Sequence, residues 1–258
     1  GEKIRTNIRL KGDRQVHYND KEKSSYRLNL KKDFAYKGLT SFSIQKPRIR
    51  NYIHEWIFHK MAKELNLVSL EYKFVNFKIN GEDKGLFVIE EGFSNTLIEK
   101  NNRRAGAIFG LNEEFEATNF FSGKFDPYQL KYWTRPDNKD LFLIAKEKLT
   151  AFQNKNLDLI EIMDIKKWSD YFALCDLLYT HHGLLPKSVK FYYNPISGLF
   201  EPIPFDGHRL KGNYHKYLIN YDNRLLIDKI ENPKSIQEKT AYSWLKLFFF
   251  NKNEEVNE

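Results

Sequence analysis

The chain has 258 residues, enough to bury a sizeable core in one large domain or two closely joined lobes. Aromatic residues make up 16% of it, which excludes an intrinsically disordered polypeptide. The net charge of +8 suits an anionic partner, but the basic residues are scattered among 34 acidic ones without a run of five like charges, so no nucleic-acid surface is expected.

The cysteine content and the hydropathy pattern exclude several further classes. With Cys175 as the single cysteine, the chain can form neither an internal disulfide nor a cysteine-based zinc cluster. No stretch approaches the roughly 18 consecutive apolar residues of a membrane span, and the N-terminus lacks a charged-then-apolar signal pattern. We therefore expect no membrane span here, and any signal or anchor to lie outside this chain.

The first third of the sequence is rich in strand patterns. Apolar and polar residues alternate over residues 4–10, which is the period of a half-buried strand, and a second strand is predicted over 26–30. Residues 71–91 alternate on both sides of Asn80 and Gly81, which predicts a β-hairpin.

A helix is predicted after Pro47, between these strands. Apolar residues recur there at spacings of three and four, which predicts that they form one face packed on a sheet. The residues of this predicted face are Ile53, Trp56, Ile57, Met61 and Leu65.

The middle of the chain is helical by the same criterion. Helices are predicted over 138–153 and 164–179, the second capped by Asp164. A further hairpin is predicted over 188–208, because turn-forming residues separate two apolar runs there. Strands followed by helices indicate an α+β class, with a lobe boundary after residues 91–93.

Taken in order, several segments resemble the CotH kinase family, protein-kinase-like proteins named after a spore-coat protein. They span most of residues 9 to 208, and their shared order is more specific than any one segment. The matching segments are RLKGD from Arg9, SYRLNL from Ser25, GLTSFSIQKPRIRNYIHEWIFHKMAKELNL from Gly38, VNFKINGEDKGLFVIEEGF from Val75, RRAGAIFGLNE from Arg103 and VKFYYNPISGLFEPIPFDG from Val189.

The resemblance implies a two-lobed, atypical protein-kinase-like fold. Residues 1–92 would form an N-terminal lobe with an antiparallel sheet and one helix. Residues 93–258 would form a mainly helical C-terminal lobe with a hairpin carrying the metal-site Asp. The implied activity is ATP-dependent transfer to Ser or Thr of a protein partner with Mg²⁺ or Mn²⁺, and the implied location is extracytoplasmic, at a bacterial cell surface or spore coat.

By this resemblance, Asp206 is the metal-binding carboxylate. It ends the apolar part of the segment FEPIPFDG, with Gly207 expected to free the turn beyond it. An ordinary Asp-Gly turn is the alternative. His208 stands where many relatives carry a second Asp, which makes Mg²⁺ coordination poorer and favours a softer metal or none.

Four more residues match family positions around the nucleotide, namely Lys11, Arg27, Arg50 and Glu91. The cations would pair with phosphates, and Glu91 would line the pocket where the lobes join. Surface charges or structural ion pairs are the alternatives. We predict that Arg27, Glu91 and Asp206 meet in one cleft.

The catalytic loop departs from the family pattern. His182, or its neighbour His181, lies where fully active relatives carry an Asp, and Ser188 lies where an Asn would help hold metal. A neutral imidazole can accept a proton from a hydroxyl but supplies no negative charge, and the histidines could instead cap a helix end. The sequence thus leaves open a phosphotransferase of weak or altered activity and an inactive pseudokinase that serves as a cell-surface binding or scaffold protein.

Overall fold

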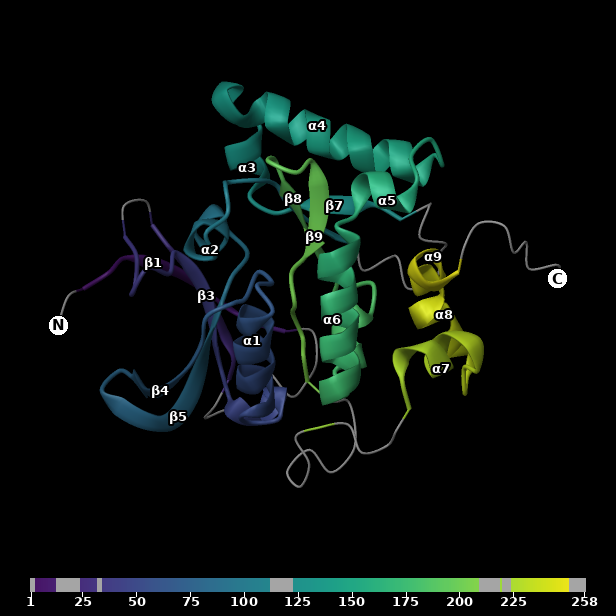
Figure 1. Cartoon of the computed structure of the whole chain (residues 1–258). Helices are drawn as coiled ribbons and strands as arrows, with labels where there is room; N and C mark the ends of the chain where they lie inside the picture. Colours follow the sequence, from purple (N-terminus) through teal and green to yellow (C-terminus); the bar gives the residue numbers. More distant parts are fainter. Residues whose placement is uncertain are drawn as a thin grey trace.

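The computed structural model of the chain describes residues 3–12, 24–31, 34–111, 123–208, 219 and 224–250. Two antiparallel sheets and several helices form an α+β structure, as the sequence predicts (Figure 1). Within these ranges, every helix is too short or too polar to cross a lipid bilayer.

The first sheet contains five antiparallel strands in the order β1-β2-β3-β5-β4. Its strands are β1 (Thr6–Leu10), β2 (Tyr26–Leu30), β3 (Ser41–Gln45), β4 (Tyr72–Ile79) and β5 (Glu82–Glu91). The predicted strands over 4–10 and 26–30 are therefore confirmed within one or two residues.

The β4–β5 hairpin turns where the sequence predicts. Asn80 and Gly81 have φ angles of 52° and 86°, and this left-handed backbone is what a tight two-residue hairpin requires. The hairpin leaves β4 at the edge of the sheet and places β5 beside β3. β5 thereby becomes an interior strand, whose C-terminal half is buried.

The second sheet has the order β7-β6-β8-β9 and lies beyond the first in the sequence. Its strands are β6 (Ile108–Leu111), β7 (Phe125–Pro127), β8 (Lys190–Asn194) and β9 (Leu199–Pro202). β8 and β9 form the second predicted hairpin. Asp206 lies four residues beyond its end, in an irregular segment.

Two long helices, α4 (Pro136–Gln153) and α6 (Ile165–Leu178), confirm the predicted ones. The Asp164 carboxylate accepts a hydrogen bond from the backbone N–H of Lys167 at 3.1 Å, as predicted for an N-cap. The remaining helical segments are η2 (Pro47–Arg50), α1 (His54–Glu64), α2 (Asn95–Lys100), α3 (Leu130–Trp133), α5 (Leu159–Ile162), η5 (His181–Leu184), α7 (Leu226–Glu231), α8 (Ile236–Tyr242), η6 (Ser243–Leu245) and α9 (Lys246–Phe249).

Helix α1 lies between the first sheet and α6 (Figure 1). Phe58 and Ala62 of α1 belong to the same buried apolar cluster as Trp168 and Cys175 of α6. Burial raises the pKa of the Cys175 thiol, which is consistent with the expected inert core position. The predicted division into 1–92 and 93–258 therefore crosses a shared core and stays a prediction.

The predicted apolar face of α1 is wrong. Ile53 is 50% exposed, and Trp56 and Leu65 are each 37% exposed. Of the predicted face, Ile57 and Met61 pack against the core, and both are only partly buried. Apolar periodicity alone therefore chose the wrong side of this helix.

The buried side of α1 carries polar residues instead. His54, Glu55 and His59 are each at most 3% exposed. The Nε2 atom of His59 lies 3.4 Å from Glu55 Oε1, and Nδ1 of His54 lies 3.1 Å from the carbonyl oxygen of Gly207. The contact of His54 with Gly207 ties α1 to the segment that carries Asp206.

Candidate functional site

One face of the first sheet collects charged side chains. Side chains alternate along a strand, and the register pairs Arg27 with Ser43 and Ser43 with Glu90, so these residues share a face. Nη1 of Arg27 donates to Oγ of Ser43 at 3.0 Å. Lys11 lies just past the end of β1, where its backbone N–H continues the ladder by donating to Ser25 O at 2.8 Å.

Glu90 is the centre of these contacts and is only 1% exposed. Its carboxylate contacts Nζ of Lys11, accepts a hydrogen bond from Nε2 of Gln45 at 3.2 Å and lies 3.4 Å from Nε of Arg50. Burial alone would raise the pKa of Glu90, but the attraction of Lys11 and Arg50 outweighs it and lowers the pKa to about 2. Burial lowers the pKa of Lys11 to about 8 although Glu90 opposes the shift, so both groups are charged at neutral pH.

Glu90, rather than the predicted Glu91, lies among these cations. Adjacent residues of a strand point to opposite faces, and the Glu91 carboxylate instead accepts from the Glu71 N–H at 2.9 Å and from Nζ of Lys100 at 3.2 Å. The expected convergence of Arg27, Glu91 and Asp206 in one cleft therefore does not include Glu91. The alternation of β3, whose Ser43 and Gln45 are polar, is the sequence signal that favours Glu90.

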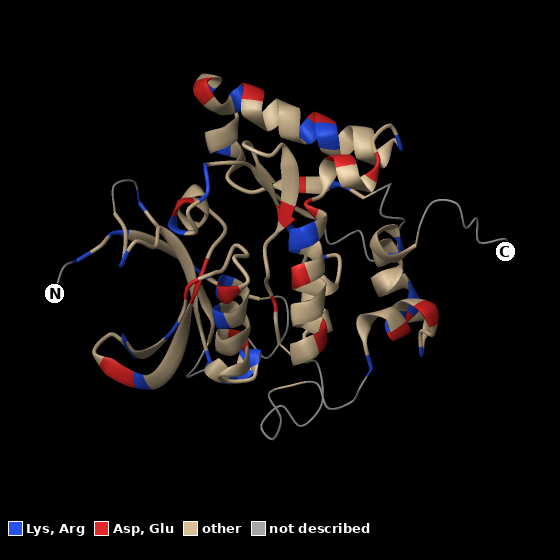
Figure 2. Cartoon of the chain, in the orientation of Figure 1, with Lys and Arg blue, Asp and Glu red and all other residues tan. Residues whose placement is uncertain are grey.

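Arg50 links the first sheet to the irregular segment that follows the second sheet. Its Nη1 atom contacts Oδ1 of Asp206, while its Nε atom faces Glu90. Lys11, Arg27, Glu90, Arg50 and Asp206 are called the charged cluster below. Elsewhere, basic and acidic residues are interspersed along α1, α4 and α6 (Figure 2). The cluster differs from that pattern because its charges are buried or partly buried and lie close together.

The backbone around Asp206 is unusual. Asp206 itself has a φ angle of 58°, in the left-handed region that few non-glycine residues adopt. Gly207, expected to free the turn, has another role: a Cβ atom there would overlap the ring of Phe58 in α1. Close packing on α1 therefore requires the glycine.

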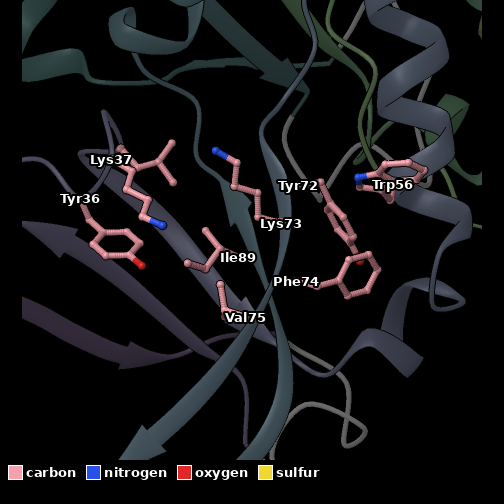
Figure 3. A pocket seen from close by; sticks show the side chains of 9 residues that line it. Tyr36, Lys37, Trp56, Tyr72, Lys73, Phe74, Val75 and Ile89 are labelled. Carbon is pink, nitrogen blue, oxygen red and sulfur yellow. The ribbon is translucent and has the colours of Figure 1, made fainter.

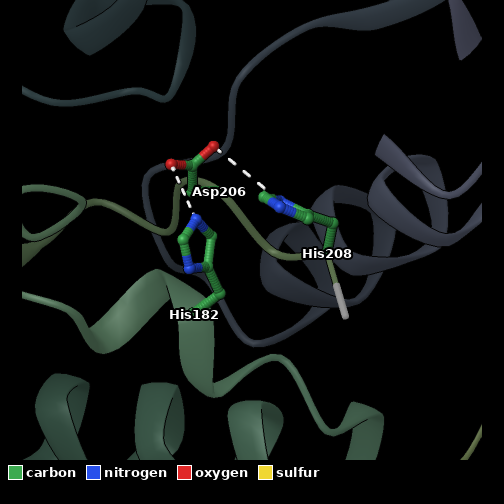
Figure 4. A group of neighbouring side chains, drawn as sticks. All are labelled: His182, Asp206 and His208. Atoms are coloured by element: carbon green, nitrogen blue, oxygen red, sulfur yellow. Dashed lines mark ion pairs between the residues drawn. The ribbon is translucent and has the colours of Figure 1, made fainter. Parts of the chain in front are cut away.

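Two histidines flank the Asp206 carboxylate (Figure 4). Nε2 of His182 lies 3.6 Å from Oδ2, and Nδ1 of His208 lies 3.9 Å from Oδ1. Oγ of Ser188 also donates to Oδ2, at 3.0 Å. We call His182, Asp206 and His208 the His-Asp-His triad; their three ligand atoms all lie within 4.8 Å of one another.

The neighbouring His181 points elsewhere. Its Nε2 atom lies 2.6 Å from Oδ1 of Asp176 at the end of α6, and burial lowers the pKa of its imidazole. The same Asp176 oxygen accepts from the backbone N–H of Leu226 at the start of α7. Of the two histidines considered for the catalytic loop, His182 is therefore the one beside Asp206.

A pocket of about 310 Å³ lies at the edge strand β4 and is separate from these groups. Its lining includes Tyr36 and Trp56 together with Tyr72, Phe74 and Ile89 (Figure 3). None of the residues that line it belongs to the charged cluster or to the His-Asp-His triad. The charged cluster and the His-Asp-His triad therefore lie outside this pocket.

One of the comparisons with known proteins agrees with the family that the order of the segments indicates. A search of curated proteins found no match to the chain. The family model described as CotH kinase protein matches residues 8–252, which is nearly the whole sequence and includes every member of the charged cluster and of the His-Asp-His triad. The chain therefore belongs to the CotH kinase protein family.

Proposed function

We propose that the chain is a nucleotide-dependent phosphotransferase whose charged cluster holds the phosphates of ATP. Family membership supports a kinase-like function. The observation that carries the proposal is a group of three cations: Lys11, Arg27 and Arg50 lie around the Glu90 carboxylate, while Asp206 contacts Arg50 and Glu55 attracts it. Cations gathered in a partly buried setting suit anionic phosphate oxygens.

Arg27 is the member best placed to meet a ligand. In the described part of the chain its hydrogen bond goes to the neutral hydroxyl of Ser43, and no carboxylate lies within ion-pair distance. Glu90 acts on it only through the electrostatic field. Because the Arg27 guanidinium forms no ion pair with a carboxylate of the described residues, it can form paired hydrogen bonds with phosphate oxygens without first breaking one.

His182 is the proposed group for orienting an acceptor hydroxyl, because it is buried beside Asp206. Family membership suggests a Ser or Thr of a protein as the acceptor and a surface location for the chain. Two lobes divided near residue 92 are part of the same proposal.

The family also implies a divalent metal, and the residues present can be tested for it. The triad offers one carboxylate and two imidazole nitrogens, whereas Mg²⁺ prefers six oxygen ligands. The donors therefore do not fit Mg²⁺, but they suit Mn²⁺ or a softer dication, which would neutralise phosphate charge. Asp206, His182 and His208 would hold it.

A pseudokinase scaffold is the second candidate. It is favoured by the contact of Arg50 with Asp206, because a guanidinium already neutralises the carboxylate expected to hold metal. His182 in place of an Asp also removes a negative charge from the catalytic loop. Such a protein would bind nucleotide or a partner without transfer.

Nucleotide binding is tested by the melting temperature in the presence of ATP. A ligand at about 100 times its Kd stabilises the folded state by about 2.7 kcal/mol, so ATP should raise the Tm of the parent. Lys11→Met should weaken ATP binding by about tenfold or more, because it removes a charged donor. The matched control is Lys166→Met, which removes a surface lysine paired with Asp170.

The pH dependence gives a second readout of the same variant. Since the pKa of Lys11 is about 8, its charge is lost as the pH rises above that value, and the ATP affinity of the parent should fall there. Lys11→Met should lack this decline. An unchanged Tm of the parent with ATP, or equal ATP shifts in all three proteins, would reject the proposed phosphate site.

A further inference from the structure

We infer that the His-Asp-His triad binds a transition-metal dication, of the class of Zn²⁺, Co²⁺ and Mn²⁺, in preference to Mg²⁺. The inference concerns the metal of the proposed site, but it depends only on the triad and can be tested without nucleotide.

The donor set is the first argument. Imidazole nitrogen is a borderline ligand that suits zinc, copper, iron and nickel and binds cobalt more strongly than manganese, whereas Mg²⁺ requires hard oxygen ligands and keeps much of its water. Two of the three donors in the triad are imidazole nitrogens. Two histidines and one carboxylate also leave coordination positions for water or for a phosphate oxygen.

The distances are the second argument. A tetrahedral dication with ligand bonds of about 2.1 Å separates its ligand atoms by roughly 3.4 Å. The carboxylate oxygens of Asp206 lie 3.6 Å from His182 Nε2 and 3.9 Å from His208 Nδ1. All three ligand atoms lie within 4.8 Å of one another, so side-chain movements on the order of 1 Å would close the triad around such an ion.

The burial of the metal-ligand side chains and their hydrogen bonds are the third argument for this metal site. His182 is 4% exposed and His208 is 8% exposed. Nη1 of Arg50 lies 3.0 Å from Nδ1 of His208, and because a guanidinium can only donate, this nitrogen must present its lone pair. An unprotonated ring nitrogen is the form that a metal requires, and here its lone pair accepts from Arg50.

Arg50 therefore competes with the metal for the same two atoms, Oδ1 of Asp206 and Nδ1 of His208. A metal ion would have to displace its Nη1 group, and the released charge would remain beside Glu90. The inference also changes the role of His182, since an imidazole that ligates a metal cannot accept a proton from a hydroxyl.

The test uses the full chain after chelator treatment and dialysis, without nucleotide. Zn²⁺ and Co²⁺ should raise the Tm, Mn²⁺ should raise it less, and Mg²⁺ at the same concentration should leave it unchanged. Co²⁺ should also give visible d–d absorption that saturates at one equivalent and persists in excess Mg²⁺.

Three variants assign the signal to the triad. His208→Ala should weaken Co²⁺ binding by about 100-fold or more, because it removes a ligand. His208→Asp, which substitutes an oxygen donor, should shift the preference toward Mg²⁺. His181→Gln removes the adjacent imidazole that faces Asp176, and it should leave the Co²⁺ spectrum unchanged.

The inference is overturned if Mg²⁺ stabilises the parent as well as Co²⁺ does, if no metal binds, or if the Co²⁺ spectrum survives His208→Ala. Competition between Co²⁺ and Mg²⁺ on the parent decides the question even where a variant fails to fold. ATP-induced stabilisation measured in chelator tests the phosphate site separately, so the two proposals can fail independently.

Discussion

Replacing Glu90 by Gln should lower the free energy of unfolding by about 3–5 kcal/mol, because it leaves Lys11 and Arg50 buried without the carboxylate that they share. Gln has the same shape and can still bond to Gln45, so the loss would report the charge. Urea denaturation measures it. Glu91→Gln is the matched control: that carboxylate is on the other face beside a partly exposed Lys100, and its removal should cost about 1 kcal/mol.

The same variant should change the pH dependence of stability. The pKa of Glu90 is lowered from 4.5 to about 2 in the folded chain, so the unfolded state binds the proton first as the pH falls. The contribution of this group is therefore complete above about pH 4.5 and is lost toward pH 2, an amount of about 3 kcal/mol. Glu90→Gln should lack that part of the acid destabilisation. If the free energy of unfolding depends on pH in the same way in the parent and the variant, the assignment of Glu90 as the buried anion is contradicted.

Asp206→Asn should reduce phosphoryl transfer by about 10²–10³-fold in a catalytically active parent. Asn can still accept the hydrogen bond from Ser188, but it removes the negative charge that faces Arg50 and His182. Radiolabel transfer from ATP to the protein itself and to a generic acceptor measures the effect, normalised to the folded fraction because Arg50 also loses its partner. The metal-dependent part of the ATP-induced Tm shift should disappear as well.

Asp170→Asn serves as the control for this change. Asp170 forms a helix-surface pair with Lys166, remote in sequence from the catalytic loop, and its loss should leave transfer within about twofold. Transfer that persists in Asp206→Asn would reject the role of this carboxylate. A parent without transfer in any of Mg²⁺, Mn²⁺, Zn²⁺ or Co²⁺ would support the pseudokinase instead, and the ATP-induced Tm shift would then be the remaining readout.

The sequence predicted best what depends on neighbours along the chain. The turn at Asn80 and Gly81 and the N-cap at Asp164 follow from backbone preferences and short hydrogen bonds, and both are confirmed. His208 could be placed beside Asp206 because the two are only two residues apart. The segments of the CotH kinase family also indicated Arg50, although its position between Glu90 and Asp206 required the tertiary structure.

The predictions from the sequence are wrong where contacts between distant segments decide which side of an element is buried. Whether Glu90 or Glu91 faces the cations depends on the register with β3, which no single strand reveals. The buried side of α1 depends on what the neighbouring segments offer, here a carbonyl of Gly207 for His54. A periodic apolar pattern does not contain that information.

The polar underside of α1 has a consequence for local stability. Phe58 and Ala62 are its fully buried apolar side chains, whereas α6 buries several, among them Trp168, Leu174 and Leu178. Less apolar area holds α1 in place, so its amide protons should exchange with solvent through openings that leave α6 intact. Because Arg50 immediately precedes this helix, each such fluctuation would loosen the guanidinium from Asp206 for a moment. A helix less firmly docked than α6 thus governs how often the carboxylate becomes accessible to a cation.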